Sequence, residues 1–462
     1  MTDKPKLDIT IVGAGIGGLM VGALLSEKGH NIKIFEKESV IGGRALTLDM
    51  SSVTLEDYKK ILSTYHMALP FSEPSLETIF EKKMLHGYHL DLGFHVLGGG
   101  VISNLNNALI SSDITCGMIK SRLYIQKNDT YQLFATTWDK ITMIPNLLRL
   151  FLSGEKTMKD LDETSIADTI KKYGTGKSKE ILEVNPRLIT TVNDLDTIST
   201  GEVFRTQRNM KLKGVRYPKN ALSHVVSNLA DVIKQNGGEI HINRPIEQIV
   251  IEGGKATGVV TNGKTYSSDI VISNILVQDL LNIVDRNHFS TEYIADITSL
   301  KGTASLCAYY SLQKIKPDLP GKNFIFIERN VDVKGGDAAG MIDFMVTLPE
   351  SGMAPPSHYL VQSYVICTPE EAKNKETLKK LKMILDKHLE RIIPDFHSQL
   401  RWAMYPVIWH LDGVARVIGN KKPDIKTPIE NLYLVGDCVN APGIGINCAL
   451  NSARLLATMI TS

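Results

Sequence analysis

The sequence contains few cysteines and no long apolar run. Its five cysteines, at positions 116, 307, 367, 438 and 448, form no CxxC or CxxxxC pair, which excludes the motif of a disulfide reductase and the spacing of a zinc site. No run is apolar over the roughly 20 residues that a membrane-spanning helix needs. The first predicted strand follows Met1 almost at once, so we expect no signal peptide. Reduced thiols and a cytoplasmic location are therefore expected.

The charges of the chain are nearly balanced. There are 52 Lys and Arg residues against 50 Asp and Glu residues, a net charge of +2, which gives no reason to expect a nucleic-acid partner. The sequence also lacks a P-loop, a nucleophile elbow, an internal repeat and any metal-ligand spacing. No metal site is expected. With 462 residues, the chain is long enough for two domains.

A glycine-rich turn near the N-terminus is the first positive signal. Gly13, Gly15 and Gly18 stand in the order GxGxxG after the apolar strand Asp8–Val12, and an apolar helix is predicted at 17–28. These glycines allow a tight turn, a close approach of the backbone to a pyrophosphate, and close packing of helix on strand. The N-terminus of the helix offers free N–H groups to phosphates. The pattern predicts a dinucleotide site.

The residues after the second predicted strand, 31–36, support this interpretation. Glu36 ends that strand, where an acidic side chain would bind the adenosine ribose hydroxyls. Gly42, Gly43 and Arg44 follow within a few residues, and they offer backbone amides and a fixed positive charge to a diphosphate or a flavin. No second GxGxxG exists in the sequence, so a separate NAD(P) domain is not expected.

The C-terminal region carries a second motif. A predicted strand ends in Gly436 and Asp437, and a final helix runs to about residue 460. A positive helix end at this place would stabilise negative charge on a bound cofactor. Cys438 follows Asp437, and a small buried side chain is the expectation for it, rather than a redox-active or flavin-tethering thiol.

Together these motifs resemble those of the FAD-dependent amine oxidase and phytoene desaturase superfamily of flavoproteins. The resemblance covers both ends of the chain and implies FAD as the cofactor. It also implies that the backbone near Ile246 contacts adenine and that Asp437 hydrogen-bonds the ribityl chain. The residues expected to bind FAD are Gly13, Gly15, Ile16, Gly17, Gly18, Glu36, Lys37, Gly42, Gly43, Arg44, Ile246, Gly436, Asp437, Gly445 and Ile446.

The expected fold class is α/β, with a Rossmann-like FAD-binding domain of discontinuous segments and an inserted α+β substrate domain built on an antiparallel sheet. The FAD-binding domain is predicted to comprise residues 1–75, 202–277 and 412–462, and the substrate domain 76–201 and 278–411. The strands expected in the antiparallel sheet are Ala304–Gln313, Asn323–Glu328, Met341–Leu348 and Tyr359–Cys367.

Two further segments are expected to be helical. Residues 51–82 have the composition of a polar, helical connection. Residues 369–391 are rich in lysine and glutamate, and their charges indicate a solvated helix face rather than a binding patch.

An Asp-x-Gly element at Asp91–Gly93 is the first candidate for the active site. In the resembled family such an element lies near the isoalloxazine ring, which implies that Asp91, Gly93 and His95 line the site and that Phe94 contacts substrate. The alternative is a hairpin with solvated ends, because glycine clusters usually mark turns.

A second candidate is the aromatic stretch that begins at Trp402. Trp402 and Trp409 are expected to form a substrate wall, although core packing explains aromatic residues equally well. Tyr405 and His410, together with His95, are the candidate catalytic acid–base residues. A structural role is the more common one for a single histidine such as His410.

The apolar segment 139–152 allows two interpretations. Pro145 and Arg149 interrupt it, and a structural helix over the substrate domain is the first expectation. The alternative is peripheral contact with a membrane surface, at a mouth through which a lipophilic substrate enters.

The resemblance is nearest to the phytoene desaturase-like branch, which includes carotenoid desaturases and isomerases. It implies desaturation, saturation or isomerisation of C–C bonds in a lipophilic isoprenoid or polyene, with hydride transfer at flavin N5. The electron partner would be oxygen, a quinone or a redox protein. One alternative is a flavin amine oxidase. A further alternative is a non-redox lipid or prenyl-protein carrier of the same fold, which would be expected to have an eroded cofactor site.

Overall fold

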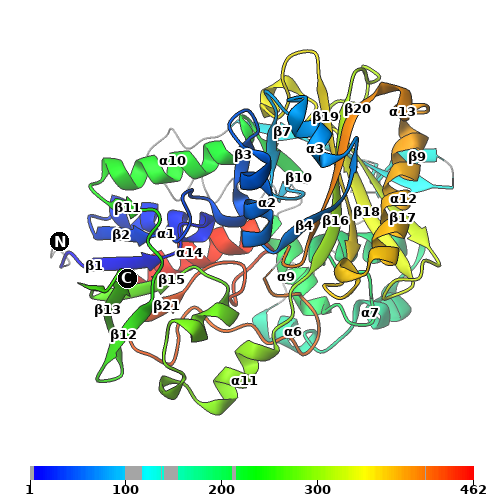
Figure 1. Ribbon diagram of the computed structural model, residues 1–462. Coiled ribbons are helices and arrows are strands. Elements are labelled where there is room, and N and C mark those ends of the chain that lie inside the picture. Colours follow the sequence, from blue (N-terminus) through cyan, green and yellow to red (C-terminus); the bar gives the residue numbers. More distant parts are fainter. Residues whose placement is uncertain are drawn as a thin grey trace.

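Two large β-sheets lie side by side in the computed structural model, each with helices packed against it (Figure 1). The described residues are 5–98, 117–128, 130–136, 138–139, 154–210, 215–411 and 413–462. The predicted segment 139–152 lies outside them except for Asp139. Within the described ranges, no helix is both long enough and apolar enough to span a membrane.

The first sheet is parallel and has five strands. In spatial order they are β11 (Glu239–His241), β2 (Asn31–Phe35), β1 (Asp8–Val12), β15 (Ile270–Ser273) and β21 (Leu432–Leu434). The chain therefore returns twice to finish this sheet. Parallel strands of this kind are buried on both faces, and Ile9, Ile11 and Val271 are each at most 2% exposed.

Helices and a small sheet cover the two faces of the parallel sheet (Figure 1). The helices are α1 (Ile16–Glu27), α10 (Ala221–Gln235) and α14 (Ile446–Thr461), and the small antiparallel sheet consists of β12 (Gln248–Glu252), β13 (Lys255–Thr261) and β14 (Lys264–Ser267). All of them contribute to one hydrophobic cluster with the sheet. The predicted α/β character and the discontinuous Rossmann-like domain are confirmed.

The second sheet has eight strands and is antiparallel except for the β17–β8 pair. In spatial order its strands are β4 (Met67–Glu73), β20 (Leu400–Ile408), β16 (Ala304–Leu312), β19 (Tyr359–Cys367), β18 (Asp337–Asp343), β17 (Lys322–Arg329), β8 (Arg122–Lys127) and β9 (Thr130–Leu133). Long apolar strands explain why a sheet was predictable here, since β16 is buried along its whole length.

Two predictions about these segments are wrong. Residues 67–73 form the edge strand β4, which pairs with β20, rather than part of a helix. Pro70 interrupts a helix but is tolerated at a sheet edge. Strand β18 ends at Asp343 instead of extending through 348, because the Asp343 carboxylate accepts a hydrogen bond from the backbone N–H of Met345 and turns the chain.

The two faces of the large sheet have different partners. Helix α12 (Lys375–Ile392) packs on one face with Leu381, Leu385 and Leu389 buried. Most of its charged residues are exposed, as predicted, but Lys382 and Asp386 are largely buried. The other face packs in a separate hydrophobic cluster with residues that lead toward the parallel sheet. A ligand site between the two sheets would therefore be bordered by this second face.

Short elements connect the two sheets. One small sheet consists of three strands, in the order β6 (Leu97–Gly98), β10 (Val215–Pro218) and β7 (Met118–Lys120). Another consists of the pair β3 (Thr47–Asp49) and β5 (His89–Asp91). The remaining α-helices described are α2 (Leu55–Thr64), α3 (Leu76–Glu81), α6 (Glu155–Asp160), α7 (Ile166–Tyr173), α8 (Gly176–Thr190), α9 (Thr200–Met210), α11 (Thr291–Ser299) and α13 (Phe396–Gln399). The 3₁₀ turns are η1 (Gly43–Ala45), η3 (Val277–Asn282), η4 (Arg286–His288), η5 (Pro349–Ser351) and η6 (Glu371–Lys373).

Candidate active site

The glycine-rich turn lies between β1 and α1 and leaves no room for side chains. Gly13 has a φ of +94°, and its N–H donates to the Phe35 carbonyl of the neighbouring strand at 2.8 Å. A Cβ added at Gly18 would lie 2.3 Å from the Gly13 carbonyl oxygen. Helix α1 can therefore approach β1 closely only with glycine at this position. The first residues of α1 lie at the end of β1, next to the cavity.

Glu36 follows β2 beside this turn. One carboxylate oxygen accepts the Ala14 N–H at 2.7 Å, and the other accepts the Glu38 N–H at 3.0 Å. The residue is only 7% exposed, and burial raises its pKa. Each oxygen keeps acceptor capacity for a further donor, such as a ribose hydroxyl.

The Gly42–Arg44 segment closes against the first turn. The Gly42 N–H donates to the Ala14 carbonyl at 2.8 Å, and Gly42 and Gly43 both have positive φ values. A Cβ added at Gly43 would lie 3.2 Å from the Gly15 Cα. The two glycine motifs thus form one surface of exposed backbone.

Arg44 connects this N-terminal surface to the C-terminal motif. Its guanidinium donates to an Asp437 carboxylate oxygen at 2.7 Å, and also to the carbonyls of His410 and Leu411. The second carboxylate oxygen of Asp437 accepts the Gly413 N–H at 2.8 Å. Burial alone would raise the pKa of Asp437, but Arg44 holds it below its usual value. Motifs separated by nearly the whole chain therefore meet in one ion pair.

A single cavity of about 1540 Å³ runs from these motifs to the large sheet. Against the parallel sheet it is lined by all but one of the residues predicted to bind FAD; Gly18 packs behind Gly13 instead. Toward the large sheet, its lining is mainly apolar. That part of the lining includes Leu123, Phe134, Ile181, Leu188, Ile325, Met341 and Tyr364.

The cavity wall fits a flavin dinucleotide. Its phosphate side consists of glycine backbone at the N-terminus of α1, where a helix end favours negative charge. Gly445 and Ile446, at the start of α14, line the cavity as well. Four residues that line the cavity, Tyr65, His95, Ser121 and Asn447, each carry a buried polar atom without a hydrogen-bond partner among the described residues. Buried polar groups are normally satisfied, so these residues have unused hydrogen-bonding capacity next to the cavity.

Phe94 and His95, which follow the Asp91–Gly93 element, line the cavity, but the element itself does not. The Asp91 carboxylate is buried and accepts hydrogen bonds from Thr47 at 2.6 Å and Tyr217 at 2.7 Å. Asp91 and Gly93 are therefore buried behind the cavity wall and are not lining residues, contrary to the prediction.

The electrostatic setting of His95 favours a neutral imidazole. Its Nδ1 lies 3.9 Å from an Asp91 carboxylate oxygen. Burial, with a contribution from Arg44, lowers the pKa of His95 to about 4. Burial raises the pKa of Asp91 to about 7, even though its two hydrogen bonds oppose the shift. At neutral pH the His95 imidazole is therefore unprotonated, and the same burial makes it a weak base.

Tyr405 lies on the wrong face of the large sheet to take part. Its side chain is fully buried in the cluster beneath α12, and its hydroxyl donates to Asp386 at 2.8 Å. Trp409 packs against the same cluster. The side chains of β20 alternate between the two faces: Trp402, Met404 and Ile408 pack in one cluster, and Ala403, Tyr405 and Val407 pack in the cluster beneath α12.

Trp402 and His410 are near the site but do not line the cavity. Trp402 is fully buried and packs edge-on against Tyr88, with 5.0 Å between ring centroids. The backbone of His410 holds Arg44, and its ring contacts His66 at 5.2 Å. The predicted aromatic substrate wall is therefore wrong, and core packing accounts for Trp402, Tyr405 and Trp409.

Several lining residues carry no recognisable signal in the sequence. Tyr65, His66, Ser121 and Asn447 line the cavity, yet none belongs to a motif. Only Asn447, which follows the predicted cofactor residue Ile446, was within reach of sequence reasoning. The four described cysteines are free and buried, in agreement with the small-filler expectation for Cys438. Among the described residues, no cluster of His, Cys, Asp or Glu could hold a metal ion.

Comparisons with known proteins identify the family. A model of the flavin-containing amine oxidoreductases matches residues 153–461, and a model of the NAD(P)-binding Rossmann-like domain matches residues 11–66. The chain belongs to the flavin-containing amine oxidoreductase family. It is an FAD-dependent oxidoreductase, as the motifs and the cavity wall predict.

Relatives of this flavin-containing oxidoreductase match along most of the chain. A chloroplastic prolycopene isomerase from Daucus carota is 24% identical, over 96% of this chain and 79% of the relative. A 1-hydroxycarotenoid 3,4-desaturase from Flavobacterium sp. is 22% identical, over 97% and 98%. The crystal structure of an oxidoreductase from Methanosarcina mazei has the same fold, with a TM-score of 0.70, 20% identity and coverage of 97% and 99%.

Proposed function

We propose that this flavoprotein desaturates, saturates or isomerises C–C bonds of a lipophilic, polyene-like isoprenoid. The observation that carries the proposal is the cavity of about 1540 Å³, which is larger than the roughly 300–1,000 Å³ of a site for one small ligand. It offers glycine backbone at one side and apolar side chains at the other. The similarity to a prolycopene isomerase and a carotenoid desaturase supports this substrate class.

The composition of the lining favours this proposal over amine oxidation. Among the described lining residues, none contributed by the large sheet, α8 or α9 is a carboxylate that could pair with an ammonium group. The aromatic residues that suggested an amine site, Trp402, Tyr405 and Trp409, do not line the cavity. A non-redox carrier is disfavoured because Glu36 and Asp437 are intact and line the cavity.

Bound FAD would supply hydride acceptance or donation at N5. The protein would hold the pyrophosphate on the glycine backbone, the ribose at Glu36, and the flavin end near Asp437 and the start of α14. The apolar wall would exclude water and align an extended hydrocarbon. We propose oxygen, a quinone or a redox protein as the electron partner. Desaturation would need this partner as an electron acceptor, whereas saturation would need a donor, a role that a reduced quinone or a redox protein could fill.

His95 is proposed as the proton acceptor in desaturation. As a hydride leaves one carbon and a proton leaves the adjacent carbon, the double bond forms between them and the proton passes to the His95 imidazole. In saturation the same residue would return the proton. His95 lines the cavity and is unprotonated at neutral pH, so its position and protonation state suit a general base, while its lowered pKa makes it a weak one.

The test is anaerobic reduction of the FAD-loaded protein by candidate substrates. We expect polyenes with saturated or cis bonds to be converted, with bleaching of the flavin band for those that are desaturated, and primary amines to give no response. Leu188→Trp, which fills the apolar part of the cavity, should slow conversion about tenfold without weakening FAD binding. Met383→Trp, on the exposed outer face of α12, is the matched control. Reduction by an amine, with no response to any polyene, would refute the proposal.

A further inference from the structure

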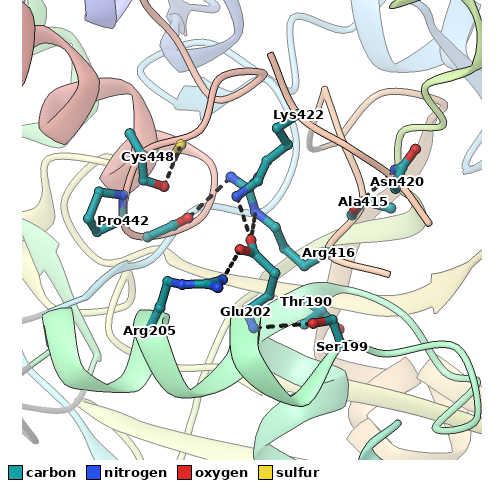
Figure 2. Close-up of polar contacts among 12 residues, drawn as sticks. Thr190, Ser199, Glu202, Arg205, Ala415, Arg416, Asn420, Lys422, Pro442 and Cys448 are labelled. Carbon is teal, nitrogen blue, oxygen red and sulfur yellow. Dashed lines mark hydrogen bonds and ion pairs between the residues drawn. The ribbon is translucent and has the colours of Figure 1, made fainter. Parts of the chain in front are cut away.

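A buried cluster of charges lies behind the cavity wall (Figure 2). Its centre is Glu202, in the first turn of α9. The Glu202 carboxylate contacts the Lys422 ammonium at 2.5 Å and the Arg416 Nε at 3.6 Å, and it also pairs with Arg205. Both Lys422 and Arg416 come from the stretch that precedes β21, and their side chains are at most 7% exposed.

The cluster contains more positive than negative charge. Arg205 makes a second ion pair with Asp162, at 2.6 Å, so the described side chains comprise three cations and two carboxylates. Burial by itself would raise the pKa of Glu202, but Lys422 and Arg416 lower it below its usual value. Glu202 is therefore ionised, and its negative charge stabilises the buried Arg416 guanidinium.

Arg416 links this cluster to the cofactor motif. One terminal nitrogen of its guanidinium donates to the carbonyls of Asp437 and Gly443, at 3.2 Å each. These two carbonyls flank the turn that precedes α14, and the first residues of α14 line the cavity. One helical turn beyond Glu202, Thr206 and Gln207 of α9 line the same cavity. The cluster thus joins two walls of the site from behind.

None of the three central residues of this cluster, Glu202, Arg416 and Lys422, lines the cavity. They cannot be contact residues for a ligand in it, so any influence on the cofactor must pass through the backbone that they hold. We propose that Glu202 and Arg416 are positioning residues for FAD: Glu202 fixes the Arg416 guanidinium, and that guanidinium fixes the turn before α14. This inference rests on the cofactor assignment and is independent of the proposed substrate.

The test is the FAD affinity of folded apo-protein, measured by fluorescence titration below the melting temperature of each variant. Glu202→Gln keeps the size of the side chain and removes its charge. Arg416→Lys keeps the charge and removes the geometry that reaches both carbonyls. Arg416→Lys should weaken FAD binding about tenfold, as expected for the loss of charge-assisted hydrogen bonds to the two carbonyls, and Glu202→Gln should weaken it by no more than that, because Glu202 contacts Arg416 as an ion pair at 3.6 Å. Asp162→Asn is the matched control, because it removes a carboxylate of the same cluster that has no direct contact with Arg416.

The double variant distinguishes positioning from a general loss of stability. If Glu202 acts through Arg416, the variant with both changes should bind FAD no more weakly than Arg416→Lys alone, since effects within one chain of contacts do not add. Multiplication of the two single effects would overturn the inference. So would an Asp162→Asn effect equal to that of Glu202→Gln, or apo-proteins that melt at lower temperature yet bind FAD with unchanged affinity.

Discussion

The five-stranded parallel sheet contributes backbone to the cavity, whereas the eight-stranded sheet contributes side chains. On the first side, Gly13, Gly15 and Gly43 leave main-chain atoms exposed to the cavity. On the second side, Ile325 and Met341 present apolar side chains. A surface of backbone has one shape and tolerates no added Cβ, while a surface of side chains can be reshaped by substitution. The cofactor should therefore be the fixed element of this site and the substrate the variable one.

The strongest test of this difference is a single methyl group at Gly18. In Gly18→Ala the new Cβ would lie 2.3 Å from the Gly13 carbonyl oxygen, so α1 and β1 would have to move apart. Overpacking of this kind costs about 1–3 kcal/mol of folding free energy. FAD affinity should fall by up to about 100-fold if binding requires α1 to return to its original place, so that the cost is added to the binding free energy. The measurement is an FAD titration of apo-protein.

Gly154→Ala is the matched control for Gly18→Ala, because a Cβ at Gly154 meets no atom within 4 Å and its φ of −71° suits alanine. This control should bind FAD like the unaltered protein. Wild-type affinity in Gly18→Ala would show that the backbone surface is not as rigid as the comparison requires.

The difference between a backbone surface and a side-chain surface also explains which parts of the site could be predicted from the sequence. The glycine motifs fix backbone conformation locally, so Gly13, Glu36 and Gly42 could be assigned from short patterns. Strand β4 is not predictable from its own sequence because Pro70 stands at its centre and its apolar residues do not alternate, so this edge strand is recognisable only when its partner β20 is known.

The side chains of the second region were the hardest to assign. Tyr405 and Trp402 lie three residues apart on one strand and therefore point to opposite faces: Tyr405 packs beneath α12 and Trp402 packs on the other face. No local pattern states which face of a sheet a helix covers. His66 lines the cavity with a φ of +56°, a conformation that the surrounding fold imposes on a residue that rarely adopts it.

The second prediction concerns the boundary between the two regions, where Asp91 is buried. The Tyr309 hydroxyl of the large sheet donates to the Asp91 carbonyl, while Thr47 donates to the carboxylate. Burial raises the folded-state pKa of Asp91 to about 7, against about 4 in an unfolded chain. Between these values the unfolded chain releases a proton that the folded protein keeps. Stability should therefore fall as pH rises from about 4 to about 7, by about 1.4 kcal/mol per pH unit.

Asp91→Asn should remove this contribution and flatten the pH dependence of urea unfolding. Some slope should remain, because burial also raises the pKa of Asp343 to about 7. Asp49→Asn is the control. A hydrogen bond from the Ser51 backbone lowers the pKa of Asp49, so removal of this carboxyl group cannot flatten the fall of stability with rising pH. An unchanged slope in Asp91→Asn would mean that Asp91 titrates as an exposed carboxyl group.

The smallest effect is expected from Tyr405→Phe, which tests whether the face beneath α12 is separate from the site. Removing the hydroxyl deletes its hydrogen bond to Asp386 and should lower the free energy of unfolding by about 1 kcal/mol. FAD affinity and turnover should not change, because the side chain is separated from the cavity by the sheet. Tyr310→Phe is the matched variant, since Tyr310 donates to the same Asp386 oxygen at 2.9 Å. If turnover fell in Tyr405→Phe but not in Tyr310→Phe, the two faces of the large sheet would be coupled, and the separation between them would no longer hold.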